Sequence, residues 1–346
     1  MTDVSIAGPV ALDRAGDALL EVRDLVVRYP VRRGLAGALR REPHRHVSAV
    51  DGVSLSVGRG EMVALVGESG CGKTSTAQSI LRMVDATSGA IRISGRDIGG
   101  LTANQLRSVR RSMQMIYQDP YESLDPRFRV RRAIEEPMVI HGIGGSKRER
   151  ERLVIDALER VDLSPADLFI ERFPHELSGG QRQRVAIAAS LVLDPALLVA
   201  DEPVSMLDVS VRAGILSLLD RLRREGGMAI LMITHDLSTA AHFADRIAVM
   251  YLGRIVEEGP AREVVRNPLH PYTKALMSVV PKRDPRDRTQ PQILQGETPN
   301  PIDVPSGCRF HPRCPVAEDR CRRIDPALHP PAGVTAEAHR AACVLV

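Results

Sequence analysis

The chain lacks tryptophan and has only five phenylalanines and five tyrosines among its 346 residues, so its core must be mostly aliphatic. No stretch approaches the roughly 18 consecutive apolar residues that a membrane-spanning helix requires. The first residues, 1–14, also lack the positive-then-apolar order of a secretion signal. These absences lead us to expect a cytoplasmic protein with no segment of its own in the bilayer.

Charge of one sign is not concentrated anywhere in the chain except in one short stretch. The formal net charge is +4, whereas nucleic-acid-binding proteins usually gather basic residues into a patch. The most basic stretch, Arg32–Arg45, is typical of a solvated loop. At this length we expect one large domain with an appendage, and the ordinary share of apolar residues argues against disorder.

Apolar runs and glycine turns predict an α/β fold. Strands alternating with helical segments, among them a helix over Ser75–Met83, favour a parallel sheet. Between residues 119 and 195 the pattern becomes helical, with one apolar face along Glu149–Leu163. Beyond about residue 260 the chain is rich in proline and reads as loop-dominated. The predicted strands are Leu19–Tyr29, Val47–Val57, Met62–Val66, Ala196–Ala200 and Met228–Ile233.

A phosphate-binding loop stands between a predicted strand and a predicted helix, with the sequence Gly67-Glu68-Ser69-Gly70-Cys71-Gly72-Lys73-Thr74. Its glycines let backbone N–H groups turn toward phosphates, Lys73 reaches the terminal phosphates, and Thr74 binds Mg²⁺. A chance match in a glycine-rich turn is the alternative, but the flanking strand and helix argue against it. Cys71 occupies a variable position, so its thiol has no expected role.

A second motif, which is acidic, follows the phosphate loop by about 130 residues: the apolar run Leu197–Ala200 ends in Asp201 and Glu202. Such a strand delivers Asp201 to the Mg²⁺ ion, and Glu202 can polarise the attacking water. Alone, this pattern fits any strand end. Together with the phosphate loop it indicates a nucleoside triphosphatase.

The string Leu177-Ser178-Gly179-Gly180-Gln181-Arg182-Gln183-Arg184 resembles the signature of ATP-binding-cassette (ABC) ATPases. It precedes an apolar helix, so it forms a second anion site at a helix N-terminus. A glycine turn that merely caps a helix would explain Ser-Gly-Gly but not the whole string. The resemblance implies a P-loop cassette with a RecA-like core, an antiparallel β subdomain and a helical subdomain.

The resemblance to ABC ATPases also assigns roles to single residues. It implies adenine stacking by Tyr29, metal and water contact by Gln118, and γ-phosphate contact by His235. Ser205-Met206-Leu207-Asp208 resembles the loop at the dimer seam, where Met206 and Val204 depart from the usual residues. The implied catalytic residues are Glu202, His235 and Gln118, and the implied Mg²⁺ ligands are Thr74, Gln118 and Asp201. The implied ATP-binding residues are Tyr29, Ser69, Gly70, Cys71, Gly72, Lys73, Thr74, Ser75, Ser178, Gly179, Gly180, Gln181 and Asp208.

The C-terminal part resembles the ATP-binding subunits of oligopeptide and dipeptide importers. The strings that carry this likeness are Leu269-His270-Pro271-Tyr272-Thr273-Lys274-Ala275-Leu276, Gly296-Glu297-Thr298-Pro299 and Pro305-Ser306-Gly307-Cys308-Arg309-Phe310-His311-Pro312-Arg313-Cys314-Pro315. We therefore expect a flexible N-terminus (1–18), a cassette (19–260, helical subdomain about 119–195) and a Pro/Cys-rich C-terminal extension (261–346). Nickel and some oligosaccharide importers share this subunit type, so the cargo stays open.

Four of the five cysteines, Cys308, Cys314, Cys321 and Cys343, lie in this C-terminal part. A reducing compartment disfavours disulfides, and the tight two-residue pair of zinc sites is absent. From the residues alone, an iron–sulfur cluster, zinc and unliganded thiols all remain open. The resemblance to the importers implies a [4Fe–4S] cluster with a structural role.

The resemblance further implies how the chain works and with which partners. Each ATP, with Mg²⁺, should lie between Lys73 of one cassette and Ser178 of a second, homologous but non-identical, ATPase subunit, and hydrolysis should reopen the pair. Two transmembrane permease subunits, contacted by about Gln118–Ile140, and an extracytoplasmic solute-binding protein complete the complex at the cytoplasmic face of the membrane. The alternatives are a non-transport ABC ATPase acting on nucleic acid or ribosomes, an idle regulatory subunit, and an exporter. The chain has no second cassette or DNA-binding insertion, and it retains Glu202 and His235.

Overall fold

The computed structural model describes residues 18–31, 45–280, 292–331 and 339–346. The predicted flexible N-terminus, except Ala18, and the basic loop, except its last residue Arg45, lie outside these ranges. A four-stranded antiparallel sheet has the order β2-β1-β4-β5. Its strands are β1 (Ala18–Pro30), β2 (His46–Gly58), β4 (Ser88–Ile93) and β5 (Arg96–Asp97).

A seven-stranded mixed sheet forms the centre of the molecule, in the order β11-β10-β9-β3-β8-β7-β6. Neighbours from β9 to β6 run parallel, whereas β10 is antiparallel to β9 and β11. Each of the five predicted strands agrees with an observed one to within one residue at either end. The strands are β3 (Met62–Val66), β6 (Met113–Ile116), β7 (Leu197–Asp201), β8 (Ala229–Thr234), β9 (Arg246–Tyr251), β10 (Arg254–Pro260) and β11 (Arg340–Ala341).

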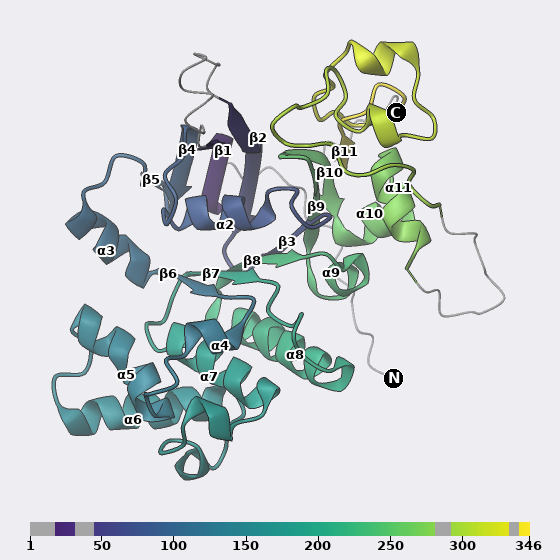
Figure 1. The fold of residues 1–346 in the computed structure, drawn as a ribbon. Coiled ribbons are helices and arrows are strands. Elements are labelled where there is room, and N and C mark those ends of the chain that lie inside the picture. Colours follow the sequence, from purple (N-terminus) through teal and green to yellow (C-terminus); the bar gives the residue numbers. More distant parts are fainter. Residues whose placement is uncertain (1–17, 32–44, 281–291, 332–338) are drawn as a thin grey trace, which may run out of the picture.

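Two apolar cores cover the two faces of the seven-stranded sheet. Along β3 the buried side chains alternate between them: Val63 and Leu65 face one core, and Met62 and Ala64 face the other. A strand buried on both faces reads as a continuous apolar run, as β3 does. The first core also contains the inner faces of β1, β2 and β4 and the helix α2 (Lys73–Ile80). Figure 1 shows α2 between the two sheets.

The predicted helical insertion is present on the other side of the larger sheet, where Figure 1 shows α5, α6 and α7 grouped together. The apolar face predicted for Glu149–Leu163 is buried, with Val154 and Leu158 in the core. Ser146 begins α6 by accepting a hydrogen bond from the backbone N–H of Glu149. The helices of this layer are α4 (Pro120–Ser123), α5 (Val130–His141), α6 (Lys147–Arg160), α7 (Gly179–Leu191) and α8 (Val209–Gly226), whereas α3 (Ala103–Arg111) packs through Leu106 against the first core.

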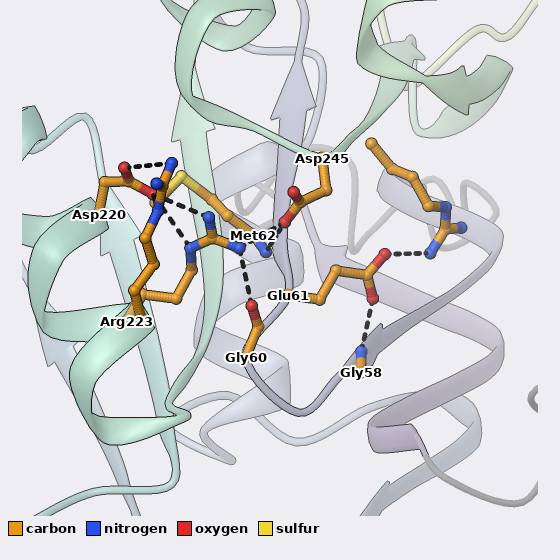
Figure 2. Close-up of polar contacts among 9 residues, drawn as sticks. Gly58, Gly60, Glu61, Met62, Asp220, Arg223 and Asp245 are labelled. Carbon is orange, nitrogen blue, oxygen red and sulfur yellow. Dashed lines mark hydrogen bonds and ion pairs between the residues drawn. The ribbon is translucent and has the colours of Figure 1, made fainter. Parts of the chain in front are cut away.

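A buried arginine fixes the start of β3, the strand that leads into the phosphate loop (Figure 2). Arg223, near the end of α8, donates hydrogen bonds to the Gly60 carbonyl oxygen (2.7 Å) and to the Asp245 carboxylate (2.6 Å). The same carboxylate oxygen accepts a hydrogen bond from the backbone N–H of Met62 (2.8 Å). Charge-assisted hydrogen bonds of this kind are roughly twice as strong as neutral ones. They join the β2–β3 turn, α8 and the entry to β9.

The segment after β10 has regular secondary structure at its start and near its end. It begins with two helices, α10 (Ala261–Arg266) and α11 (Pro271–Ser278), which follow α9 (Leu237–Phe243) in the helix order. Pro271 is the first residue of α11, a position where the missing N–H is not needed. Near its end the chain returns to the sheet, because β11 pairs with β10 through Glu257 and Glu258. The C-terminal residues therefore extend the central sheet by one short strand, while most of the described residues beyond α11 lie in loops, as the prolines predict.

Among the residues that the structure describes, no helix is both long and apolar enough to cross a bilayer.

Candidate nucleotide site

The phosphate loop joins β3 to α2, and its shape depends on glycine. Gly72 is the N-cap of α2 and has a φ of 109°, in the left-handed region that favours glycine. A Cβ atom at Gly72 would lie 2.1 Å from the carbonyl oxygen of Ala49. The Lys73 ammonium donates hydrogen bonds to the carbonyl oxygens of Gly67 (2.7 Å) and Glu68 (2.9 Å). The loop is thus wrapped around the Lys73 cation at its centre.

Asp201, the last residue of β7, supplies a buried carboxylate beside this loop. The residue is only 4% exposed, and its Oδ1 atom has no hydrogen-bond partner among the described residues. Burial raises the pKa of the Asp201 carboxyl, and a hydrogen bond from Thr74 offsets this only in part. A desolvated carboxylate oxygen beside a threonine hydroxyl is a donor set that suits Mg²⁺.

Glu202 stands at the centre of a small polar cluster. It has a φ of 44°, a conformation that costs a non-glycine residue free energy and is concentrated at functional sites. Gln118 Nε2 donates a hydrogen bond to Glu202 Oε2 (3.1 Å), and His235 Nδ1 lies 3.2 Å from Glu202 Oε1. Three segments that are distant in sequence therefore bring together the three predicted catalytic side chains.

A cavity of about 690 Å³ connects the phosphate loop with this cluster, a volume typical of small-molecule sites. Tyr29 lies at its wall and donates a hydrogen bond to Ser75 (3.3 Å). Three further lining residues, Val47, Ala49 and Pro301, were not expected from the sequence. The predicted residues that line the cavity are Tyr29, Ser69, Gly70, Gly72, Lys73, Thr74, Ser75, Gln118, Glu202 and His235.

Cys71 does not line the cavity, because its side chain is turned into the core and is 1% exposed. Burial raises the pKa of its thiol, and Lys73 counteracts this only partly. Its backbone N–H donates to the Glu68 carbonyl oxygen at 3.3 Å. The side chain therefore acts as a small apolar residue beneath the loop.

The signature residues form the start of α7 and do not line this cavity. Ser178 is the N-cap: its hydroxyl accepts a hydrogen bond from the Gln181 backbone N–H, and the Gln181 side chain accepts one from the Ser178 backbone N–H. A Cβ atom at Gly180 would lie 2.5 Å from Val211 of α8, so this glycine permits close packing of the two helices. Asp208, the N-cap of α8, is also outside the cavity. The helix N-terminus at Ser178–Gln181 thus lies outside the cavity of its own chain.

The four C-terminal cysteines line one small cavity together with His270 and His311. All four lie in the described part of the chain, and there none forms a disulfide. Burial raises the pKa of the Cys308 thiol to about 11, and its three neighbouring cysteines add to this. Within the described ranges, no three His, Cys, Asp or Glu side chains are arranged to hold a metal ion. The ligand set of the [4Fe–4S] cluster that the resemblance implies is therefore not preformed among the described residues.

The sequence did not show how the C-terminal segment meets the phosphate loop. Arg313 donates a hydrogen bond to the Glu68 carboxylate (2.8 Å), and Thr298 donates another (2.9 Å). The carbonyl oxygen of Pro301 accepts a hydrogen bond from the Ser48 backbone N–H (3.0 Å). No local pattern signals these contacts, because they join residues more than 200 positions apart.

The fold and the site define the class of this protein: it is an ATPase with the ABC cassette fold, α/β with one antiparallel and one mixed sheet. Residues 50–205 match the family described as ABC transporter, and residues 256–321 match the oligopeptide/dipeptide transporter C-terminal region. The chain belongs to the ATP-binding subunits of the oligopeptide/dipeptide ABC transporters, as its similarity to curated proteins also shows.

The relatives resemble this chain over nearly its whole length. The probable peptide ABC transporter ATP-binding protein y4tS of Sinorhizobium fredii is 48% identical over 91% of this chain and 87% of the relative. The oligopeptide transport ATP-binding protein OppF of Salmonella typhimurium is 45% identical, over 90% of this chain and 92% of its own length.

Two solved structures share the cassette. The dimeric ATP-binding cassette MJ0796, in a post-hydrolysis state with ADP and Pi, has a TM-score of 0.61 and 28% identity. The match covers 70% of this chain and 99% of the MJ0796 chain. CbiO1 from Clostridium perfringens, part of an ABC transporter complex, has a TM-score of 0.62 and 28% identity over 72% of this chain and 92% of its own.

Proposed function

We propose that this chain hydrolyses ATP to drive the import of peptides, or of a chemically related solute, through a membrane permease. The observation that carries the proposal is the combination in one chain of a complete hydrolysis cluster and a C-terminal region of the peptide-transporter type. The curated relatives bear names of peptide transport proteins, which supports the same cargo class.

The proposed chemistry follows from the groups around the cavity. Lys73 and the backbone N–H groups at the start of α2 bind the terminal phosphates, and Tyr29 stacks on the adenine. Thr74, Asp201 and Gln118 would hold Mg²⁺, which neutralises charge on the β- and γ-phosphates when it is bound. Glu202 accepts a proton from the attacking water. His235, which lies next to the other carboxylate oxygen than Gln118 does, contacts the γ-phosphate.

We further propose that the complete site needs a second cassette. Ser178, Gly179, Gly180 and Gln181 form an anion-binding helix end that lies outside this chain's own cavity, and Asp208 is placed similarly. Pairing two cassettes head to tail would bring these groups to the partner's ATP. The related cassette MJ0796 was solved as a dimer, which is consistent with this arrangement.

The permease contact is proposed for the segment from Gln118 to about Ile140. A groove of about 340 Å³ lies along it, with Tyr117, Phe128 and Pro137 among its walls. Tyr121, Val139 and Ile140 are exposed apolar side chains of the same region. Exposed apolar side chains beside a groove are typical of a protein-binding surface.

The same segment is coupled to the hydrolysis cluster. Gln118 donates a hydrogen bond to Glu202, so a movement of this segment would change the position of the Glu202 carboxylate. The complex would then lie at the cytoplasmic face of the membrane.

The proposed domain limits are 1–18, 19–260 and 261–346, with the helical subdomain at about 119–195. In the last of these, we propose that Cys308, Cys314, Cys321 and Cys343 hold a [4Fe–4S] cluster, which would cross-link the C-terminal loops. The support is chemical: four thiols, the ligand set of such clusters, surround one cavity without forming disulfides in the described part of the chain. The thiols would have to rearrange and deprotonate to bind the cluster.

Anaerobic purification should yield a brown protein with about four iron atoms per chain. Replacing Cys308 and Cys321 with serine should remove both the colour and the iron, because serine does not replace the thiolate ligands. Elemental analysis and the visible absorption spectrum give the result. A colourless wild-type protein without iron, purified under the same conditions, would mean that the cavity holds no cluster.

The import function is tested by purifying the chain with its membrane partners and reconstituting the complex in lipid vesicles. We expect co-purification of permease subunits, and ATP hydrolysis that rises severalfold when short peptides and the co-purified binding protein are added. Sugars and nickel salts serve as the comparison cargoes. Stimulation by RNA or ribosomes in place of peptides, with no permease bound, would favour the non-transport alternative.

A further inference from the structure

We propose that Arg313 in the C-terminal segment is a positioning residue for ATP binding, acting through Glu68 of the phosphate loop. The inference rests on the proposed nucleotide site and adds to it a residue, outside the cassette's own motifs, that affects ATP affinity. It begins from the position of Glu68, whose carboxylate stands in the loop that must bind the negative phosphates of ATP.

The Glu68 carboxylate is paired by residues of the C-terminal segment. Arg313 contacts both of its oxygens, at 2.8 Å and 3.2 Å, and Thr298 donates to one of them at 2.9 Å. The Arg313 side chain is only 9% exposed, so this charge pair is shielded from water on the arginine side. Burial alone would lower the pKa of Arg313, but the hydrogen bonds to Glu68 raise it, so the guanidinium stays charged.

The backbone of Glu68 is held as well. Its N–H group donates a hydrogen bond to the Tyr272 hydroxyl of α11 at 3.0 Å, and its carbonyl oxygen accepts one from the Lys73 ammonium at 2.9 Å. Tyr272 packs against Phe310 with ring centroids 5.4 Å apart, and both are fully buried. The C-terminal segment therefore holds the phosphate loop in two ways. Phe310 packs against Tyr272, which bonds to the backbone of Glu68, and Arg313 pairs with the Glu68 carboxylate.

Two consequences follow for ATP. First, Arg313 cancels the negative charge of Glu68, which would otherwise repel the phosphates bound by the same loop. Second, the pair keeps the Glu68 carbonyl oxygen where it orients Lys73. Pro301 lies in the same C-terminal segment and lines the nucleotide cavity itself, so this segment contacts both the phosphate loop and the wall of the cavity.

Replacing Arg313 with methionine should therefore raise the Kd and KM for ATP about 5- to 10-fold, the low end of typical coupling between sites. The kcat should stay within about twofold, because Arg313 contacts none of the groups around Glu202. The double variant Arg313→Met with Glu68→Gln should bind ATP more tightly than Arg313→Met alone, since the uncompensated carboxylate is gone. A purely structural role for Arg313 would give no such recovery.

The experiment measures ATP binding by calorimetry and steady-state ATPase kinetics on the full chain. Arg320→Met, which removes an exposed arginine paired with Glu318 in the same segment, is the matched control. Thr298→Val provides a milder variant that removes one hydrogen bond to Glu68 if Arg313→Met does not fold. Wild-type protein that binds no ATP would contradict the proposed function itself. Wild-type affinity in folded Arg313→Met or Thr298→Val, or no recovery in the double variant, would overturn the inference alone.

Discussion

Replacing Glu202 with glutamine should lower the kcat for ATP hydrolysis about 100- to 1,000-fold while leaving ATP binding nearly unchanged. The substitution keeps the size of the side chain and its ability to bond with Gln118, but an amide cannot accept the proton of the attacking water. In the structure the carboxylate is held by Gln118 at 3.1 Å and His235 at 3.2 Å. These two contacts hold the carboxylate in one orientation, as a general base requires.

The same variant should accumulate the closed dimer, because ATP remains bound between two cassettes when it is not hydrolysed. Size-exclusion chromatography with ATP and Mg²⁺ measures the dimer, and phosphate release measures the turnover. Glu225→Gln, an exposed position at the end of α8, is the control and should behave like the wild type. Steady-state ATPase near the wild-type rate in Glu202→Gln would exclude Glu202 as the general base.

Three strands of the central sheet, β3, β7 and β8, could be predicted from the sequence because each is an apolar run followed by glycine or by polar residues. The other four strands of this sheet, β6, β9, β10 and β11, were not predicted. Met62–Val66 is the clearest case: it is apolar throughout, it ends in the phosphate loop, and it agrees with β3 at both ends. The helix after the loop begins two residues earlier than predicted, at Lys73, since Gly72 already serves as its N-cap. Cap geometry of this kind depends on a positive φ that periodicity alone does not show.

The C-terminal segment could not be predicted to the same degree, because its structure depends on contacts with distant residues. β11 contains only Arg340 and Ala341, too few for a periodic pattern, and exists because β10 offers an edge to pair with. Proline is common before α11 and in the following loops; it predicted a loop-dominated segment but gave no sign of α10, α11 or β11. The pairing of Arg313 with Glu68 joins residues 245 positions apart, and neither residue type signals the other.

The residues of the candidate site likewise fall into those that could be predicted from the sequence and those that could not. Residues in short motifs, such as Lys73 and Thr74, could be assigned because a loop between a strand and a helix fixes their relative positions. Val47, Ala49 and Pro301 line the same cavity but belong to no motif, since each contributes a wall rather than a chemical group. Shape-forming residues of this kind emerge only when the sheets are packed together.

Replacing Lys73 with methionine should weaken ATP binding about 10- to 100-fold and reduce hydrolysis below detection. The Lys73 side chain is buried at the centre of the loop, where its ammonium donates to the carbonyl oxygens of Gly67 and Glu68. Charged hydrogen bonds to phosphate contribute about 1.5–3 kcal/mol each, and the loop presents this cation to the terminal phosphates. Methionine preserves the length and packing of the side chain, so the loss of ATP affinity measures the contribution of the positive charge.

The fold of Lys73→Met should survive, because its apolar side chain can occupy the space between β3 and α2 without an unpaired charge. Thermal unfolding followed by circular dichroism checks this, and calorimetric titration with ATP and Mg²⁺ gives the affinity. Lys147→Met, which removes an exposed lysine at the start of α6, is the matched control and should bind ATP as the wild type does. Unchanged ATP affinity in folded Lys73→Met would show that the phosphates are held by the backbone N–H groups of the loop alone, and Lys73 would then have no role in binding.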